Sequence, residues 1–319
     1  MPTSPTSDSS RTTLEIGSQP ECWRRALGLA GPNAAALPRP GERVAVIGCG
    51  TSWFMAQAYA ALREQAGLGE TDPFAASEFP TGRGYDRIVA ITRSGTTTEV
   101  LRALTEVRHR IPTTALTADP NTPVMDAADQ VVVLDFADEE SVVQTRFATT
   151  ALALLRAHLE AQGPLPRGVR PVAEAVGDAE RALAEPIPAE ALAAQQWTFL
   201  GAGWTAGLAQ EAALKMREAA GAWTEAYPAM EYRHGPISIT GPGRVAWMFG
   251  TLPAGLAGDV AAVGGHLVAQ SQYDAGDLDP MADLVRVQRL AVALAHAADR
   301  DPDRPLNLTR SVILTPAGR

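Results

Sequence analysis

Two glutamates and a lysine at helical spacing are the first residues of this chain that could do chemistry. Glu211, Lys215 and Glu218 stand at positions i, i+4 and i+7, which places their side chains on one face of a helix. Lys215 is the only lysine of the 319 residues, and lysine can give up its proton near neutral pH, which arginine cannot. His234, in a tight turn before Gly235 and Pro236, adds a second proton carrier. An exposed ion-pair face would explain the helical spacing equally well, but together these residues form a candidate acid/base set.

A hydroxyl-rich loop, residues 92–98, is the second candidate. It follows an apolar run and precedes an expected helix, and a glycine within it lets the backbone approach a ligand closely. Hydroxyls together with the free N–H groups of a helix N-terminus bind anions such as phosphate. A well-capped strand-to-helix turn would need fewer hydroxyls and no arginine. We expect ligand contacts from Thr92, Arg93, Ser94, Gly95 and Thr97.

A glycine turn earlier in the chain, residues 48–52, also leads from an apolar run into a helix. Gly50, Thr51 and Ser52 are its candidate ligand contacts. The turn is neither a dinucleotide fingerprint, because Trp53 stands where a third glycine is expected, nor a Walker loop. Alone, the two glycines of this turn are weak evidence for a ligand site.

The elements that carry these residues are duplicated. Gly48 and Gly50 match Gly201 and Gly203 at an offset of 153 (201 − 48), and the residues that follow also match. Residues 128–133 align with 282–287 at an offset of 154, and residues 87–91 parallel 244–248. Three segments in the same order at nearly the same offset indicate two copies of one domain.

Short apolar runs alternate with helices in both copies, which is the pattern of a parallel sheet covered on both faces, an α/β fold. We expect a flexible tail over 1–20, a first domain over 21–185 and a second over 186–319. The expected strands of the first copy are 44–47, 88–92, 113–117 and 131–134. Those of the second copy are 198–200, 245–249, 266–269 and 284–287. Helices are expected over 98–108, 148–160, 172–185 and 290–299.

Composition excludes several classes of protein. A net charge of −9 argues against sequence-independent binding to nucleic acid or to anionic lipid. No apolar run reaches the roughly 20 residues that span a bilayer, and the first residues lack the apolar stretch of a signal peptide. Two cysteines are too few for a disulfide framework or a zinc cluster. We therefore expect a cytoplasmic protein.

The order of these motifs resembles the sugar isomerase (SIS) family with two such domains. Members include the isomerase half of glucosamine-6-phosphate synthase and amino-sugar-phosphate deaminase/isomerases. The resemblance implies that Glu218 moves a proton between C1 and C2 of a sugar, assisted by Lys215 and Glu211. It also implies that His234 opens the sugar ring in the neighbouring subunit of a homodimer, and that the hydroxyls of both turns and Gln144 bind the phosphorylated sugar. The motifs occupy residues 48–52, 77–79, 92–98, 139–146, 211–218, 234–236 and 307–311.

Two departures from the family bear on the reaction. The chain begins Met-Pro-Thr, so we expect no glutamine-hydrolysing domain and no ammonia drawn from glutamine. The family's lysine near the C-terminus, which forms a Schiff base, is replaced by Arg310, which stays protonated and cannot form an imine. Arg310 could instead bind a phosphate or a carboxylate.

The expected function is aldose–ketose isomerisation of a 6-phosphorylated sugar or amino sugar, with loss of ammonia in the latter case. Proton transfer through an enediol or enolamine needs no metal or organic cofactor. Two alternatives stay open: a deglycase that splits an amino acid from a sugar 6-phosphate, with Arg310 or Arg233 holding the carboxylate, and a phosphosugar-binding sensor without catalysis. A sensor needs only the phosphate loop, so the presence of Glu218, Lys215 and His234 is evidence against that alternative.

Overall fold

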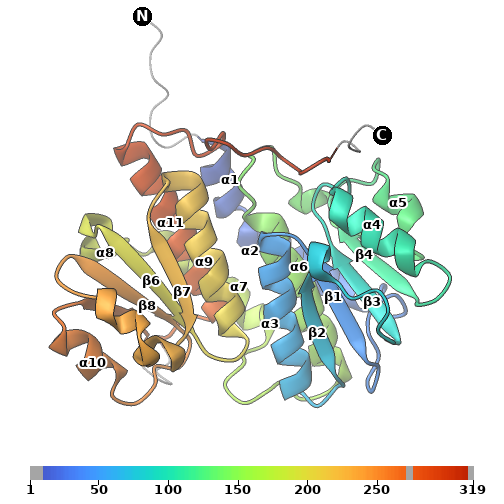
Figure 1. The fold of residues 1–319 in the computed structure, drawn as a ribbon, viewed down its shortest axis with the longest axis horizontal. Coiled ribbons are helices and arrows are strands. Elements are labelled where there is room, and N and C mark those ends of the chain that lie inside the picture. Colours follow the sequence, from blue (N-terminus) through green and yellow to red (C-terminus); the bar gives the residue numbers. More distant parts are fainter. Residues whose placement is uncertain (1–9, 271–275, 315–319) are drawn as a thin grey trace, which may run out of the picture. The chain divides into compact units, whose positions relative to one another are not determined.

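The computed structural model describes residues 10–270 and 276–314. By its contacts the chain forms two compact units, each built on one parallel sheet (Figure 1). We call them the β1–β5 unit and the β6–β9 unit. The β1–β5 unit comprises Cys22–Glu139, Arg146–Pro171 and the described residues from Thr309 onwards. The β6–β9 unit comprises the described residues up to Glu21, together with Glu140–Thr145 and Val172–Leu308.

The sheet of the β1–β5 unit has the strand order β2-β1-β3-β4-β5, and neighbouring strands are parallel throughout. Ala45, Ile47, Ile88 and Ala90 pack with the helix over residues 98–107 on one face. The strands are β1 (Val44–Gly48), β2 (Thr71–Ala75), β3 (Arg87–Ile91), β4 (Thr113–Thr117) and β5 (Gln130–Val133). The helices are α2 (Gln19–Ala30), which belongs to this unit from Cys22 onwards, α3 (Thr51–Gln65), α4 (Thr98–Val107), α5 (Val124–Ala127) and α6 (Arg146–Gln162).

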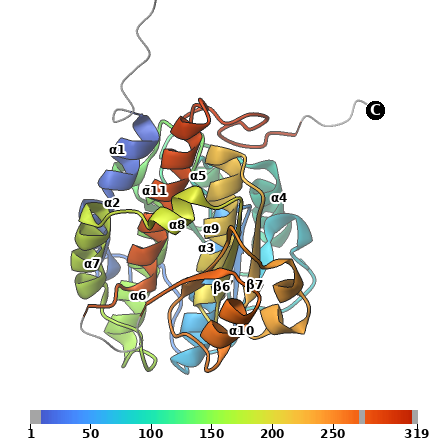
Figure 2. The same ribbon diagram turned by 90° about the vertical axis from the view of Figure 1, so that its left-hand side faces the viewer.

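The β6–β9 unit repeats this plan with the strand order β7-β6-β8-β9. Its strands are β6 (Gln196–Gly201), β7 (Thr224–Pro228), β8 (Arg244–Phe249) and β9 (His266–Ala269). Its helices are α1 (Arg11–Gly17), α7 (Val172–Ala184), α8 (Ala189–Ala193), α9 (Thr205–Ala220), α10 (Leu256–Ala262) and α11 (Pro280–Ala297). Helix α11 packs against both α7 and α9, as Figure 2 shows.

The expected α/β class, with two parallel sheets flanked by helices, is confirmed. Two strands that the sequence analysis did not predict, β2 and β7, begin at Thr71 and Thr224, again 153 residues apart (224 − 71). Both are edge strands, and each contains polar residues and a proline, so neither reads as an apolar run. The duplication is therefore more complete than the matching segments indicated.

The fourth strand expected in the second copy is wrong. Residues 284–287 lie inside α11, whose N-cap is Asp279; its carboxylate accepts from the Met281 N–H at 2.9 Å. A short apolar run cannot be distinguished from a segment of a buried helix by periodicity alone. Most residues of α11 from Met281 to Val292 are buried, which explains why this helix segment looks like a strand.

The expected flexible tail is also wrong for the residues that the structure describes. Residues 11–17 form α1, which begins at the N-cap Ser10. Asp303 holds this helix start, since its carboxylate accepts from the Thr12 N–H at 2.8 Å and from the Arg11 N–H at 3.0 Å. Residues 1–9 lie outside the described part of the chain.

The units divide the chain differently from the expected boundary after residue 185. Helix α7 belongs to the β6–β9 unit, and its first residue, Val172, stands 153 positions after Gln19, the first residue of α2 (172 − 19). Helix α7 is thus the counterpart of α2 and opens the second copy. The described residues after Thr309 return to the β1–β5 unit.

Within the described residues, no helix has both the length and the apolar composition that crossing a membrane requires. A cytoplasmic location stays a prediction.

Candidate functional site

The hydroxyl loop joins β3 to α4 at the carboxyl end of the strand. The Ser94 hydroxyl accepts from the Thr96 N–H at 3.3 Å and from the Thr96 hydroxyl at 3.1 Å, which fixes the loop. Thr92 Oγ1 is buried and has no hydrogen-bond partner among the described residues. A buried hydroxyl without a partner is costly, so Thr92 is suited to a ligand oxygen.

The glycine turn after β1 lies at the same edge of the sheet, because β1 and β3 are parallel neighbours. Gly50 has a φ of +53°, and the side chains of Thr51 and Ser52 beyond it are buried. In open α/β sheets, ligands bind at the carboxyl ends of the strands. The β1–β5 unit thus brings the candidate residues of both turns to one edge.

Arg93 gives the hydroxyl loop a buried positive charge. Its Nη1 lies 3.8 Å from Glu139 Oε2, and both side chains are almost completely buried. Its Nη2 donates to the backbone oxygen of Arg310 at 2.9 Å. The guanidinium is therefore held between the loop and the C-terminal segment of the same unit.

The C-terminal segment, residues 309–314, covers the start of α4. The Thr98 N–H donates to the Val312 oxygen at 3.2 Å, the Leu314 N–H donates to Thr98 Oγ1 at 2.9 Å, and the Ser311 and Thr96 hydroxyls are 2.9 Å apart. The expectation of free N–H groups at this helix N-terminus is therefore wrong for Thr98. Ligand contacts from the hydroxyls of the loop and from Arg93 stay a prediction. Thr96 and Ser311, whose hydroxyls join the loop to the C-terminal segment, were not among the predicted site residues.

Arg310 is held by its own unit. Its guanidinium donates to Asp138 Oδ1 at 2.5 Å and to the backbone oxygen of Glu139. Gln144 belongs to the β6–β9 unit, and its Oε1 is buried with no partner among the described residues. A role for either residue in binding a substrate stays a prediction.

Cys49, in the glycine turn, is not a reactive thiol in this structure. Burial and the nearby charge of Glu99 raise the pKa of the Cys49 thiol to about 11. The thiol therefore stays protonated near neutral pH, and a role as nucleophile is not supported.

Gly95 can be tested directly. Its φ is +62°, and a Cβ added to it would lie 2.0 Å from Thr122 Oγ1. We expect Gly95→Ala to lower the free energy of unfolding by about 1–3 kcal/mol, because backbone strain and a clash coincide. Gly177→Ala in α7 is the matched control: nothing lies within 4 Å of the added Cβ, and alanine favours a helix interior by about 0.5–1 kcal/mol. Urea unfolding of both variants would contradict the prediction if their stabilities moved in the same direction.

Helix α9 brings Glu211, Lys215 and Glu218 together. Lys215 Nζ contacts Glu218 Oε2 and lies 3.4 Å from Glu211 Oε1. Lys215 and Glu211 are only 1% exposed, whereas Glu218 is 18% exposed. The interpretation as a solvated ion-pair face is therefore wrong. One ammonium with two carboxylates in a buried setting is costly to maintain, which is typical of a functional site.

Glu218 is the member of this cluster that solvent or a ligand can reach. His234 closes the 3₁₀ turn Glu231–His234 and is exposed, and it makes no hydrogen bond or ion pair with a described residue. The next residue, Gly235, has a φ of +144°. Arg233 is engaged elsewhere, because its Nε donates to Asp259 Oδ2 at 2.7 Å. The structure therefore brings Glu211, Lys215 and Glu218 into contact, but it shows no contact between this cluster and His234.

The fold and these residues define a class: a duplicated parallel α/β protein with a polar turn site in one unit and a buried acid/base helix in the other. No family model matches the chain. A glutamine–fructose-6-phosphate aminotransferase (isomerizing) from Xanthomonas campestris pv. campestris is 30% identical over 336 residues, covering 89% of this chain and 54% of the relative. The corresponding protein of Sulfurisphaera tokodaii is 31% identical over 213 residues, covering 63% of this chain and 35% of the relative. The chain thus spans about half or less of these relatives.

Solved structures have the same fold. Glucosamine-6-phosphate deaminase from Thermotoga maritima matches with a TM-score of 0.79 and 22% identity, covering 96% of this chain and all of that one. Tagatose-6-phosphate ketose/aldose isomerase from Escherichia coli matches with a TM-score of 0.75 and 17% identity, covering 99% of this chain and all of that one. These sequence relatives and this duplicated fold support the resemblance to the double sugar isomerase (SIS) domain family.

Proposed function

We propose that this protein is an aldose–ketose isomerase of a 6-phosphorylated sugar or amino sugar, and that it releases ammonia from an amino sugar. The observation that carries the proposal is Lys215, buried between Glu211 and Glu218. A sensor of phosphosugars would need a phosphate site but no buried acid/base cluster. The names of the sequence relatives and of the structural neighbours support a sugar-phosphate substrate.

The chemistry of the proposal assigns one role to each group. Glu218 removes the proton from C2 of the open-chain aldose, the electron pair forms the C1–C2 double bond, and the carbonyl oxygen gains a proton. Glu218 then returns its proton to C1 while the C2 hydroxyl gives up its proton, which replaces the one gained by the C1 oxygen, and the ketose results. With an amino sugar the same transfer yields an imine at C2, and water adds to release ammonia. Lys215, buried beside Glu218, supplies the positive charge that stabilises the developing oxyanion.

The phosphate-binding part of the proposal rests on the two turns of the β1–β5 unit. The hydroxyls of Thr51, Ser52 and Thr92 are buried at one sheet edge, and Arg93 supplies a positive charge there. Ser94 and Thr97 complete the proposed contacts. No metal or organic cofactor takes part in these steps.

The direct test is incubation of the purified protein with glucosamine 6-phosphate and, separately, galactosamine 6-phosphate. Ammonia and ketose 6-phosphate are measured together, and fructose 6-phosphate is supplied in the reverse direction. Equal amounts of ammonia and ketose are the expected result. The proposal is overturned if neither these sugars nor a panel of other 6-phosphorylated aldoses and ketoses is converted.

Deglycation of an amino acid carried on a sugar 6-phosphate is the second candidate. The observation that favours it is Arg310, whose side chain is 37% exposed while its guanidinium is oriented by Asp138. A partly exposed guanidinium could bind the extra carboxylate. Arg233 is the weaker choice, because Asp259 already pairs with it. Release of a free amino acid from glycated 6-phosphates, without turnover of the amino sugars, would select this reaction.

The proposal includes a homodimer in which His234 serves the partner's site. His234 and Met230 follow the carboxyl end of β7, where Met230 is 50% exposed, and Trp223, just before the amino end of the same strand, is 76% exposed. Apolar side chains in such positions are typical of a surface that another protein covers.

We therefore expect Trp223→Glu to convert the dimer to a monomer and to lower turnover at least tenfold, because a carboxylate in an apolar interface remains unpaired. Light scattering during size-exclusion chromatography measures the mass. Leu192→Glu, which changes another exposed apolar residue, is the control and should leave the dimer intact. A wild-type protein that is already monomeric at micromolar concentration would contradict the homodimer.

A further inference from the structure

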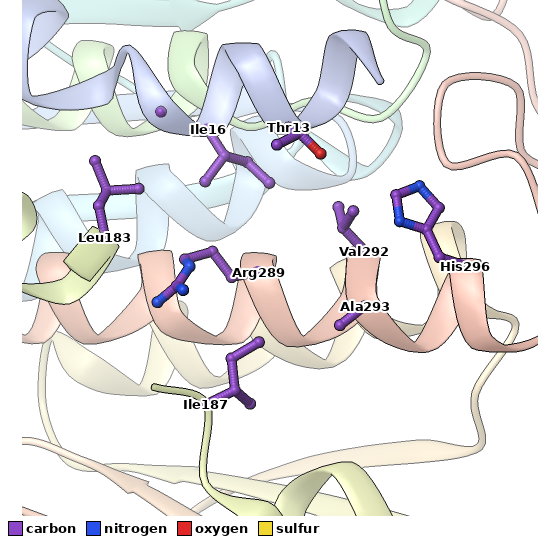
Figure 3. A pocket seen from close by; sticks show the side chains of 9 residues that line it. Thr13, Ile16, Leu183, Ile187, Arg289, Val292, Ala293 and His296 are labelled. Atoms are coloured by element: carbon purple, nitrogen blue, oxygen red, sulfur yellow. The ribbon is translucent and has the colours of Figure 1, made fainter. Parts of the chain in front are cut away.

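A cavity of about 560 Å³ lies within the β6–β9 unit, between α1, α11 and the segment that follows α7. Figure 3 shows Ile16 of α1 facing α11, with Leu183 at one end and Ile187 on the opposite side from α1. Val292 of α11 completes the apolar wall. The size falls in the range of about 300–1,000 Å³ that is typical of small-molecule sites. None of the residues proposed for catalysis or phosphate binding lines it.

The charge in this cavity comes from Arg289. Its Nη1 donates to the backbone oxygens of Ala182 at 2.7 Å and Glu185 at 2.6 Å, so the end of α7 holds the guanidinium in place. The guanidinium lies along the cavity beside Leu183 in Figure 3. Because two carbonyls use Nη1 alone, the other nitrogens remain for a ligand.

No acidic side chain is among the nine described residues that line the cavity. Glu185, which does not line the cavity, pairs with Arg286 Nε at 3.5 Å and also acts electrostatically on Arg289. The cavity therefore carries an excess of positive charge next to apolar walls. This combination discriminates against cations and favours an anion.

His296 gives the cavity a second polar end. It stands seven residues after Arg289 on α11, which corresponds to roughly 10 Å along the helix. Ala293 lies between them along the helix, and all three residues line the cavity. The space thus suits an elongated ligand with its acidic group at Arg289 and an apolar body extending toward His296.

We propose that this cavity binds a small organic carboxylate with an apolar body, such as a medium-chain acid. The carboxylate pairs with the Arg289 guanidinium, and the body packs against Ile16, Leu183 and Val292. This site is independent of the proposed isomerase reaction, so it can be tested without any substrate of that reaction.

Isothermal titration with three probes tests the proposal: octanoate carries both features, octanamide only the apolar body, and acetate only the charge. We expect octanoate to bind at least tenfold more tightly than either of the others, and Arg289→Met to abolish this preference. Equal binding of octanoate and octanamide, or no binding of octanoate, overturns the proposal.

Because Arg289 also holds the end of α7, a second pair of variants keeps the test independent of folding. Ala293→Glu and Ala293→Gln add side chains of equal size to the cavity-facing side of α11, and both are compatible with a helix. The glutamate should weaken octanoate binding at least tenfold relative to the glutamine, because only it repels the carboxylate. Equal affinities in this pair contradict recognition of the charge.

Discussion

Replacement of Glu218 by glutamine should lower the turnover of the sugar phosphate by about 10²–10⁴-fold, the contribution that a general base makes to such a step. Glutamine preserves the size of the side chain and a hydrogen-bond acceptor for Lys215 Nζ, but it cannot remove a proton from carbon. Affinity for the sugar phosphate should change less than threefold, because the proposed phosphate contacts lie on other residues. Steady-state kinetics and titration calorimetry with the same ligand separate the two effects.

The matched control for this variant is Glu174→Gln, an exposed glutamate on α7, which should leave turnover unchanged. If Glu218→Gln retains full turnover, Glu218 is not the base. If affinity is lost together with turnover, Glu218 holds the ground state of the substrate, and the assignment of a purely chemical role is wrong.

The fold was largely predictable because its strands are continuous apolar runs that end at glycine or at a polar turn. Residues 44–47, 113–117 and 266–269 became strands with almost the expected limits. The failures have two physical causes. Edge strands β2 and β7 are polar and only partly buried, so they lack the apolar run, and α11 is buried on so many sides that part of it resembles a strand.

The candidate site was predictable as residue types and less so as contacts. Helical spacing placed Glu211, Lys215 and Glu218 on one face, but spacing alone does not say whether a face meets solvent or the protein interior. The pairing of the α4 start with Val312 depends on a chain segment more than 200 residues away, and local sequence contains no signal for it. Both the burial of the α9 face and the pairing of the start of α4 are set by tertiary packing.

Replacement of Lys215 by methionine should destabilise the protein by about 3–5 kcal/mol, the usual consequence of removing one partner of a buried ion pair. Methionine fills a similar volume, so the loss comes from charge and not from a cavity. Glu211, at 1% exposure, would remain buried without the ammonium 3.4 Å away. Urea unfolding measures the effect. Arg102→Met is the control: it removes the i,i+4 partner of Glu106 from an exposed pair, where at most about 0.5 kcal/mol is expected.

The double variant Glu211→Gln with Lys215→Met separates this electrostatic cost from catalysis. With the buried carboxylate gone, most of the lost stability should return, giving a coupling energy of at least about 1.5 kcal/mol in the double-mutant cycle. Turnover should not return, because the ammonium beside Glu218 is still missing. Additive losses of stability would show that Glu211 does not depend on Lys215 for its charge. Recovery of turnover in the double variant would mean that Lys215 acts only by neutralising Glu211 and takes no part in the proton transfer.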